Sequence, residues 1–496
     1  MDTNDKHIVA IDLGTSKIAL TVAKIYDDDI QIIYYKETPA KGMRYSCVFN
    51  ESNVGEQLSS AIKEAEEQLG IKITQAVVGM PKYSVRQETT NATINNRGED
   101  TDITSENVAT LKDFALSLYP LEDESKEAIF GAVAQSFSDG ENFQIIEEEI
   151  VGMSSDTLEG NFKIFIGKKS DLRKIDKVMV KNEIAAMRKY FTAESTAKAV
   201  LTDSEMESGV ALIDFGGGST SVSVYHGNVM RHYASIPFGG KNITQDIRTE
   251  CQITESLAEN IKIAYGACMP DKLQSLSDKI IYIKGSGADP DKQLPVKYLS
   301  EIITARVEEI IMAILYEIEG SGFADMLRSG IVVTGGCARM ANLSNFIFDI
   351  SGFKTRIGYP KKSFSYMGCE SFAETSSATS AGLILAASKD QTVNCTVEAA
   401  ERRILTEIEI EHGNDTEDTA GVGVAGTEDN PQGKIWEDKD IEKVENPEGK
   451  TVKKRRSGEG ISVKFTKIKK SFEEIVVEPV IKFCEEFSES DPNEKA

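Results

Sequence analysis

The sequence predicts an α/β fold made of two related halves, with an α+β unit inserted into the first half and a disordered tail after about residue 390. Three observations support this prediction: short apolar strands separated by turns, one strand–turn motif that occurs twice about 200 residues apart, and a change of composition near Asp390. The length of 496 residues suits roughly two to four domains.

The first half is expected to begin with a meander of three strands. Apolar and β-branched residues dominate residues 8–11, 18–23 and 30–35, and turn residues separate these segments. A helix at 54–69 and a strand at 71–79 are expected to follow.

The second half is expected to repeat the strand–turn–strand pattern and to continue with helices. Its expected elements are strands at 210–214, 220–225 and 331–334, helices around 241–250, 254–265 and 299–319, and a closing helix at 376–388. The predicted divisions are a first half at 1–83 with 169–200 and 374–390, an inserted unit at 84–168, a second half at 201–373 with an outer part at about 240–325, an acidic disordered linker at 391–460 and a C-terminal amphipathic segment at 461–496.

The repeated motif is an apolar strand that ends in aspartate and runs into glycine and hydroxyl residues. Residues 8–17 read IVAIDLGTSK, and residues 211–220 read ALIDFGGGST. Glycine lets the backbone N–H groups approach an anion closely, hydroxyl groups add donors, and Lys17 adds a charge. Asp12 and Asp214 can hold Mg²⁺. Two tight hairpin turns are the alternative, but the duplication favours a phosphate site between the two halves.

Charge and cysteine usage exclude several classes of protein. The 80 acidic and 56 basic residues give a net charge of −24, which disfavours binding to nucleic acid. The seven cysteines include no CxxC pair, so free thiols in a reducing cytosol and no zinc site are expected. We expect no signal peptide and no membrane-spanning segment, so any membrane contact would come from a surface-lying segment or a partner.

Both motifs resemble the phosphate loops of the actin, chaperone and sugar-kinase superfamily, which implies an actin-like fold of duplicated RNase H-like halves. Residues 332–340, VVTGGCARM, resemble its adenosine loop, and residues 258–266, AENIKIAYG, resemble its nucleoside-binding helix. The resemblance implies ATP and Mg²⁺ as ligands, with Asp12 and Asp214 near the metal. The residues implied to bind the nucleotide are Gly14, Thr15, Ser16, Lys17, Gly216, Gly217, Gly218, Ser219, Glu259, Lys262, Gly335, Gly336 and Arg339.

Two of these implied assignments have simple structural alternatives. Glu194 matches the place where some bacterial actins carry a glutamate that positions water, and with Asp12 and Asp214 it completes the candidate catalytic residues; a solvated helical glutamate explains it at least as well. Glu259 and Lys262 also have the spacing of an i,i+3 pair on a solvated helix face.

Within the superfamily, the chain most resembles the FtsA family of bacterial cell-division proteins, over about residues 6–390. Residues 41–48 resemble the early loop of that family, residues 77–81 lead into an inserted unit where the family carries its own, and residues 231–240 also fit. The resemblance implies a protein on the cytoplasmic face of the cell membrane at the division site. It implies ATP binding with weak or no hydrolysis, polymerisation with itself, and contact with later division proteins and with the C-terminal peptide of the tubulin-like FtsZ, in the outer part at about 240–325.

The C-terminal segment has the pattern of a membrane-surface anchor. Residues 461–477 place apolar side chains on one helical stripe with lysines beside it, and the basic cluster at 453–456 adds attraction to anionic lipid. Glu473 and Glu474 interrupt the pattern and Pro479 follows it, so a helix packed on the folded body or on a partner is the alternative. A single short anchor binds weakly, and polymerisation would strengthen it.

Other members of the superfamily offer competing functions. A sugar kinase would need a substrate-binding motif, which we do not find, and would have no evident use for a linker and an anchor helix. A chaperone would need a substrate-binding β-domain, but the chain after residue 390 is too poor in apolar residues to build one. A pilus-assembly scaffold is a further alternative.

Overall fold

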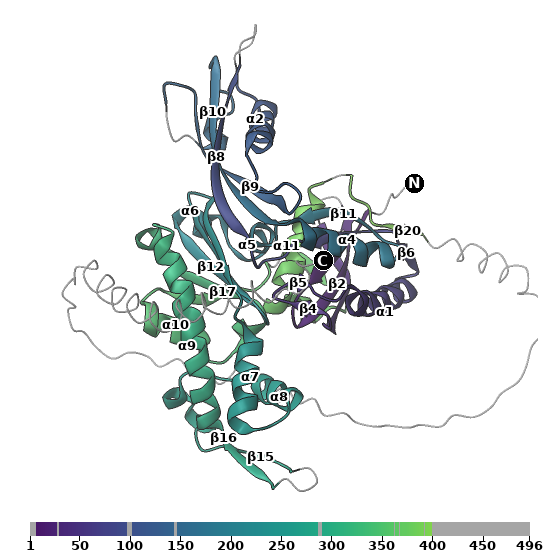
Figure 1. Ribbon diagram of the computed structural model, residues 1–496, viewed down its shortest axis with the longest axis vertical. Helices are drawn as coiled ribbons and strands as arrows, with labels where there is room; N and C mark the ends of the chain where they lie inside the picture. Colours follow the sequence, from purple (N-terminus) through teal and green to yellow (C-terminus); the bar gives the residue numbers. More distant parts are fainter. Residues whose placement is uncertain are drawn as a thin grey trace, which may run out of the picture. The chain divides into compact units, whose positions relative to one another are not determined.

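A computed structural model describes residues 6–26, 29–96, 102–142, 146–285, 290–361, 363–366, 368–390 and 392–398. The predicted C-terminal segment at 461–496 and nearly all of the predicted linker at 391–460 lie outside the described residues. The described chain contains two large β-sheets, each with its own helices, and a smaller three-stranded sheet (Figure 1).

The first large sheet has the strand order β11-β7-β1-β2-β3-β19. Its strands are β1 (Lys6–Leu13), β2 (Lys17–Tyr26), β3 (Asp29–Pro39), β7 (Gln75–Gly79), β11 (Ala185–Tyr190) and β19 (Phe364–Tyr366). The predicted meander is confirmed, because β1 and β3 both pair antiparallel with β2. Strand β7 then pairs parallel with β1, and β11 pairs parallel with β7.

The second large sheet has the order β14-β13-β12-β17-β18 and repeats the first sheet except for β19, which has no counterpart. Its strands are β12 (Val210–Phe215), β13 (Thr220–His226), β14 (Val229–Ile236), β17 (Ile331–Thr334) and β18 (Thr355–Ile357). Again an antiparallel meander is followed by two parallel strands. The loop after β12 is therefore the counterpart of the loop after β1, and the loop after β17 is the counterpart of the loop after β7.

Two segments depart from the sequence-based expectations. The single strand expected at 71–79 is divided into β6 (Ile71–Ile73) and β7, and β6 pairs with β20 (Thr396–Glu398) instead of joining the large sheet. The division falls at Thr74, because the backbone N–H groups of Thr74 and Gln75 both donate to the carbonyl of Cys395. Strand β19 lies within the range 201–373 assigned to the second half, yet it pairs with β3 in the first sheet.

The helices flank these sheets, and several lie where the periodicity predicted them. They are α1 (Glu51–Leu69), α2 (Ser105–Leu118), α3 (Glu147–Ile150), α4 (Lys169–Lys181), α5 (Thr192–Val200), α6 (Asp203–Ser208), α7 (Gly240–Cys251), α8 (Glu255–Tyr265), α9 (Val296–Gly320), α10 (Leu343–Ser351) and α11 (Ala378–Ser388). Short 3-10 helices are η1 (Pro270–Lys272), η2 (Gln274–Leu276), η3 (Ala324–Met326), η4 (Gly336–Arg339), η5 (Glu370–Ala373) and η6 (Thr375–Ser377). No helix in these ranges is both long and apolar enough to cross a bilayer.

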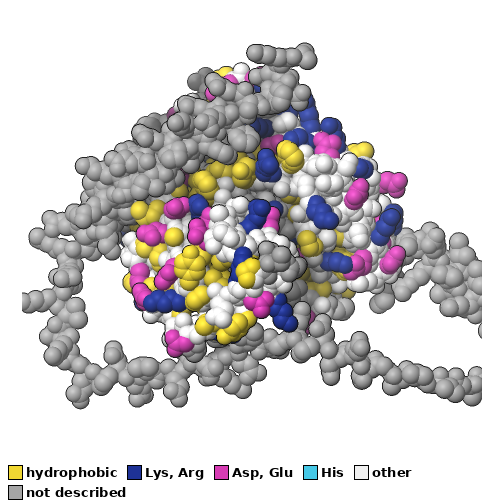
Figure 2. Space-filling view, turned by 60° about the horizontal axis from the view of Figure 1, so that its bottom comes forward, with side chains coloured by type: hydrophobic (Ala, Val, Ile, Leu, Met, Phe, Trp, Pro, Cys, Tyr) yellow, Lys and Arg dark blue, Asp and Glu magenta, His cyan; other side chains and the backbone are white. Residues whose placement is uncertain are grey.

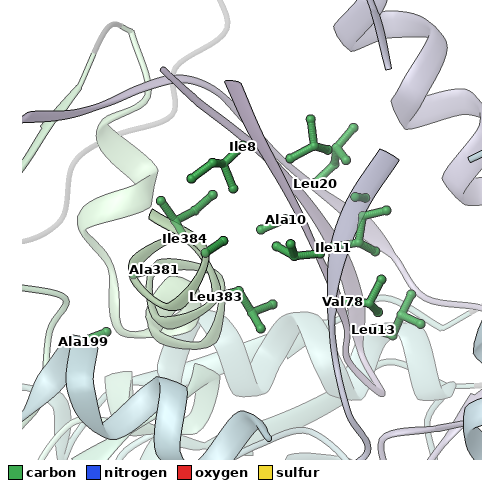
Figure 3. Packing of buried hydrophobic residues seen from close by; sticks show 14 of the residues in the cluster. Ile8, Ala10, Ile11, Leu13, Leu20, Val78, Ala199, Ala381, Leu383 and Ile384 are labelled. Carbon is green, nitrogen blue, oxygen red and sulfur yellow. The ribbon is translucent and has the colours of Figure 1, made fainter. Parts of the chain in front are cut away.

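The core of the first half lies between β1 and the helices α5 and α11. Figure 3 shows Ala381 and Ile384 of α11 on the side of β1 from which Ile8 and Ala10 project. All four side chains are fully buried. Burying each of the two isoleucines contributes about 1.5–3 kcal/mol. The packing holds β1 against α11.

The inserted unit is an antiparallel sheet with the order β8-β10-β9, and α2 packs on it (Figure 1). Its strands are β8 (Arg86–Asn95), β9 (Glu127–Ser138) and β10 (Thr157–Lys168). A separate small core, centred on Phe137, Phe162 and Leu111, holds it together. The remaining short strands are β4 (Met43–Arg44), β5 (Cys47–Val48), β15 (Ile280–Ile283) and β16 (Lys292–Pro295).

Candidate functional site

The two motif loops meet each other between the halves. A Cβ atom on Gly217 would overlap the Ser16 hydroxyl and lie 2.9 Å from the Cβ of Ser16. A Cβ atom on Gly218 would lie 2.7 Å from the Thr15 hydroxyl oxygen. Only glycine permits such an approach, because any larger residue would push the loops apart. The structure therefore brings residues 14–16 and 216–219, which the duplication predicted as a pair, into direct contact.

Each loop is closed by the same backbone turn. A Cβ atom on Gly14 would lie 2.7 Å from the carbonyl oxygen of Lys17, and one on Gly216 would lie 2.7 Å from the carbonyl oxygen of Ser219. In the second loop the N–H of Gly216 also donates to the Ser219 carbonyl at 3.1 Å. The repeat seen in the sequence is thus a repeat of backbone geometry, and both turns need glycine at the same position.

Asp12 and Asp214 are buried at the ends of β1 and β12, beside these loops. Burial raises the pKa of Asp12, and the positive charges of Lys82 and Lys17 only partly oppose this effect. Carboxylate oxygens in such a place suit a hard divalent cation such as Mg²⁺. A bound cation would also offset the cost of keeping Asp12 ionised away from water.

Lys82 lies against these carboxylates, although the sequence analysis did not select it. Its Nζ donates to the Asp214 carboxylate and, at 2.9 Å, to the hydroxyl of Thr379 in α11. Burial by itself lowers the pKa of Lys82, but the charges of Asp214 and Asp12 outweigh it, so the pKa is raised. Lys82 therefore remains a cation while largely removed from water.

Lys17, predicted as a phosphate ligand, is held by the neighbouring strand. Its Nζ donates to the carboxylate of Glu37 and, at 3.3 Å, to the hydroxyl of Tyr35, both in β3. Burial lowers the pKa of Lys17 in spite of the nearby Glu37. Burial also acts to raise the pKa of Glu37, but the charge and hydrogen bonds of Lys17 outweigh it and bring that pKa below its usual value. A phosphate group would compete with Glu37 for this ammonium.

Glu259 and Lys262 are linked to the second loop by hydrogen bonds to the first residues of α7. Lys262 Nζ donates to the Gly240 carbonyl at 2.9 Å, to the Thr244 hydroxyl at 2.8 Å and to Glu259 at 2.7 Å. The Lys262 side chain is only 10% exposed, so it does not lie on a solvated helix face. The N–H of Gly240 in turn donates to the Gly216 carbonyl at 3.0 Å.

The predicted adenosine loop follows β17 and borders the same site. Gly335 has a φ of +91°, and a Cβ atom there would lie 2.6 Å from Oδ1 of Asp214. A Cβ atom on Gly336 would meet nothing within 4 Å, so its surface is open. Arg339, at the end of η4, is exposed and lies 3.8 Å from Glu374. The loop thus carries both a tight contact to Asp214 and an accessible edge.

Glu194 lies in the first turn of α5 and pairs with Lys198 one turn later, at 2.6 Å. Burial and, to a lesser degree, the charge of Glu194 raise the pKa of Tyr225 in β13. The suggested role of Glu194 in positioning water stays a prediction, and its ion pair with Lys198 is that of a helix-surface glutamate.

Three more side chains bridge the halves and were missed in the sequence. Lys241 Nζ donates to the Thr15 carbonyl at 3.0 Å, the Ser46 hydroxyl lies 3.0 Å from the Ser219 hydroxyl, and the Tyr233 hydroxyl donates to the Lys82 carbonyl. The sequence duplication could have pointed to Lys82. This residue lies in the loop after β7, which is the counterpart of the adenosine loop after β17. Loops that follow parallel strands lie at the carboxyl edge of a sheet, where ligands bind.

Comparison with known proteins finds similarity to one family of cell-division proteins. The family model for cell division protein FtsA matches residues 211–382. The chain is 29% identical to cell division protein FtsA of Neisseria meningitidis over 368 residues, which cover 73% of this chain and 86% of that protein. It is 29% identical to the FtsA of Borreliella burgdorferi, covering 78% and 92%, and 26% identical to that of Bacillus subtilis, covering 72% and 79%.

Solved structures show the same architecture at low sequence identity. A chain of the PilM-PilN type IV pilus biogenesis complex matches with a TM-score of 0.53 and 12% identity, covering 77% of this chain and 98% of that chain. At this identity the likeness speaks for the fold alone. The fold is actin-like, as the resemblance of the two motifs implied.

Proposed function

The chain belongs to the FtsA family of cell-division proteins, and from that premise we propose that it binds ATP with Mg²⁺ between its two halves, polymerises, and tethers the FtsZ polymer to the cytoplasmic membrane at the division site. One observation carries the nucleotide part of this proposal. Two loops with the same glycine turn, one from each half, meet beside two buried aspartates.

The residues present fit a nucleotide with its metal. The N–H groups and hydroxyls of the loops at 14–16 and 216–219 would hold the phosphates. Asp12 and Asp214 would hold Mg²⁺, which supplies positive charge opposite the phosphate oxygens. Glu259 and Lys262, already linked to the second loop through Gly240, would contact the nucleoside, and Gly335, Gly336 and Arg339 would flank the base.

Slow turnover is part of the proposal. The candidate water-positioning residue Glu194 pairs with Lys198 of its own helix, and this ion pair makes it a weaker base. A nucleotide held tightly by two halves but poorly supplied with a general base favours assembly over hydrolysis. We therefore assign the nucleotide to filament formation.

The outer part of the second half supports a partner site for the FtsZ peptide. Ile263 of α8 and Tyr282 of β15 are each 72% exposed, and Ile280 and Tyr298 are also exposed. Figure 2 turns the β15–β16 end of Figure 1 forward, and hydrophobic side chains appear there among acidic and basic ones. Apolar anchors inside a charged rim are typical of peptide-binding surfaces.

Attachment to the membrane is proposed from the sequence of the tail. The stripe at 461–477 and the basic cluster at 453–456 have the pattern of an interfacial helix that binds anionic lipid. Many copies in a filament would give the multivalent binding that a single anchor lacks. Later division proteins would then assemble on this filament.

Titration calorimetry tests the nucleotide part. Purified full chain is titrated with ATP in Mg²⁺ or in EDTA, beside Asp12→Ala and the surface control Asp349→Ala. We expect binding that needs Mg²⁺, that Asp12→Ala weakens at least about tenfold, and that the control retains. Failure of the unmodified chain to bind ATP, or an unaffected Asp12→Ala variant, would reject the site. A fluorescent fusion at the native locus tests the division role: a mid-cell ring supports it, and diffuse signal throughout growth contradicts it.

A further inference from the structure

Lys82 connects the two halves through both its side chain and its backbone. It follows β7 of the first half, and its Nζ donates to Asp214 of the second half. Its carbonyl accepts a hydrogen bond of 2.5 Å from the hydroxyl of Tyr233, which lies in β14 of the second half. The Lys82 side chain is 16% exposed and that of Asp214 is 11% exposed, so water screens the pair weakly.

The position of Lys82 suits one purpose, the neutralisation of two carboxylates. Asp12 and Asp214 face the same buried site, and each raises the pKa of Lys82. Two like charges removed from water destabilise each other unless a cation lies near both. Other nearby lysines are engaged elsewhere: Lys17 with Glu37 of β3, Lys262 with Glu259, and Lys241 with the Thr15 carbonyl.

Lys82 and a divalent cation are attracted to the same carboxylate. The Lys82 ammonium donates to Oδ2 of Asp214, and the same side chain fits Mg²⁺ at the end of β12. A metal ion bound there would face the Lys82 ammonium at close range, and two cations repel in a site of low dielectric. Binding of one cation at Asp214 therefore weakens binding of the other.

We propose that Lys82 competes with Mg²⁺ for Asp214. When the metal binds, the direct ion pair between Lys82 and Asp214 is lost, and the bound ligand connects the two halves instead. The role of the released ammonium rests on the proposed nucleotide function, because it becomes available to a phosphate oxygen beside the two loops. The competition itself does not rest on that function, and it is a property of Lys82, Asp214 and the metal alone.

Three variants separate this competition from a general loss of packing. Lys82→Met keeps the aliphatic length and removes the charge. Lys82→Gln also removes the charge but keeps a donor for Thr379, which makes it the second variant if Lys82→Met does not fold. Lys241→Met is the matched control, because Lys241 also crosses between the halves but bonds to a carbonyl instead of a carboxylate.

The experiment measures Mg²⁺ binding to the full chain without nucleotide. Protein freed of metal with EDTA is titrated with MgCl₂ alone at constant ionic strength, by calorimetry and by the shift of the melting temperature. We expect weak binding by the unmodified chain and by Lys241→Met, and binding at least about tenfold tighter by Lys82→Met and Lys82→Gln. The same Mg²⁺ affinity in all four proteins would overturn the proposal, as would tighter binding in Lys241→Met alone.

A parallel titration with ATP and Mg²⁺ keeps the two proposals apart. If the unmodified chain does not bind ATP but the Lys82 variants gain Mg²⁺ affinity, the nucleotide function fails and the competition stands. If the unmodified chain binds ATP and the Lys82 variants gain nothing, the competition fails and the nucleotide function stands.

Discussion

Gly217 lies directly against Ser16, so the phosphate-type loop of the second half touches the loop of the first half with no side chain between them. The contact joins segments 201 residues apart in the sequence. It makes the spacing of the two halves sensitive to the size of residue 217.

We expect Gly217→Val to weaken ATP binding at least about tenfold, since its branched side chain would overlap Ser16 and separate the loops. Calorimetric titration with ATP and Mg²⁺ measures the effect. Gly320→Ala, at the end of α9 where a Cβ atom meets nothing within 4 Å, is the control and should bind as the unmodified chain does. Unchanged binding by Gly217→Val would show that the loops do not hold the nucleotide.

Phe165 joins three parts of the fold, and we expect Phe165→Ala to lower the free energy of unfolding by about 3–5 kcal/mol. This buried ring of the inserted sheet lies 4.7 Å from that of Phe191 in the first half and 6.0 Å from that of Tyr233 in the second. Urea denaturation provides the measurement. Val180→Ala, at a side chain 73% exposed, should change stability by less than about 0.5 kcal/mol. A similar small loss for Phe165→Ala would mean that the inserted unit does not brace the halves.

The ion pair between Glu205 and Arg356 should make stability depend on acid pH. Burial alone would raise the pKa of Glu205, but hydrogen bonds from Arg356 and Thr202 bring it below its ordinary value of 4.5. The carboxylate therefore stabilises the fold fully above about pH 5 and loses this effect as the pH falls through its lowered pKa.

For Glu205→Gln we expect a loss of about 1 kcal/mol at pH 7, a modest value because Arg356 is partly exposed. Urea unfolding of both proteins from pH 7 down to about pH 3 should show the difference shrinking below about pH 4.5. A difference in unfolding free energy that stays constant over this pH range would mean that Glu205 stabilises the fold by packing instead of by its charge.

Removal of the chain after about residue 455 should abolish binding to anionic vesicles. The predicted anchor stripe at 461–477 supplies the apolar contact, and its loss leaves an acidic chain that anionic lipid repels. Co-sedimentation with vesicles containing phosphatidylglycerol compares the full chain, the truncation and Phe472→Glu. Equal pelleting of the full chain and the truncation would contradict the anchor.

The backbone of the site could be predicted from the sequence, but its ion pairs could not. Glycine spacing and strand ends are local signals, so the turns at Gly14 and Gly216 followed from the motif and its repeat. Lys82 and Asp214 are 132 positions apart in the sequence, and the few residues around Pro81 do not indicate that Asp214 is the partner of Lys82. Long separation in the sequence also explains why β6 was not predicted as a separate strand. The Cys395 carbonyl, more than 300 residues later, accepts a hydrogen bond from the Thr74 N–H, and β6 therefore leaves the large sheet.

Strand β20 attaches the end of the described chain to the first half. Residues 396–398 pair with β6, and the N–H of Cys395 donates to the carbonyl of His7 in β1. The chain after Glu398 is therefore attached to the first half. It is connected covalently to the second half only through the first. Mechanical tension on the tail would be delivered to the half that carries Asp12 and Lys82. The opposite half would receive that tension through the chain segments and contacts that join the halves, among them Lys82 with Asp214 and Ser16 with Gly217, so pulling force and ligand state would act on the same contacts.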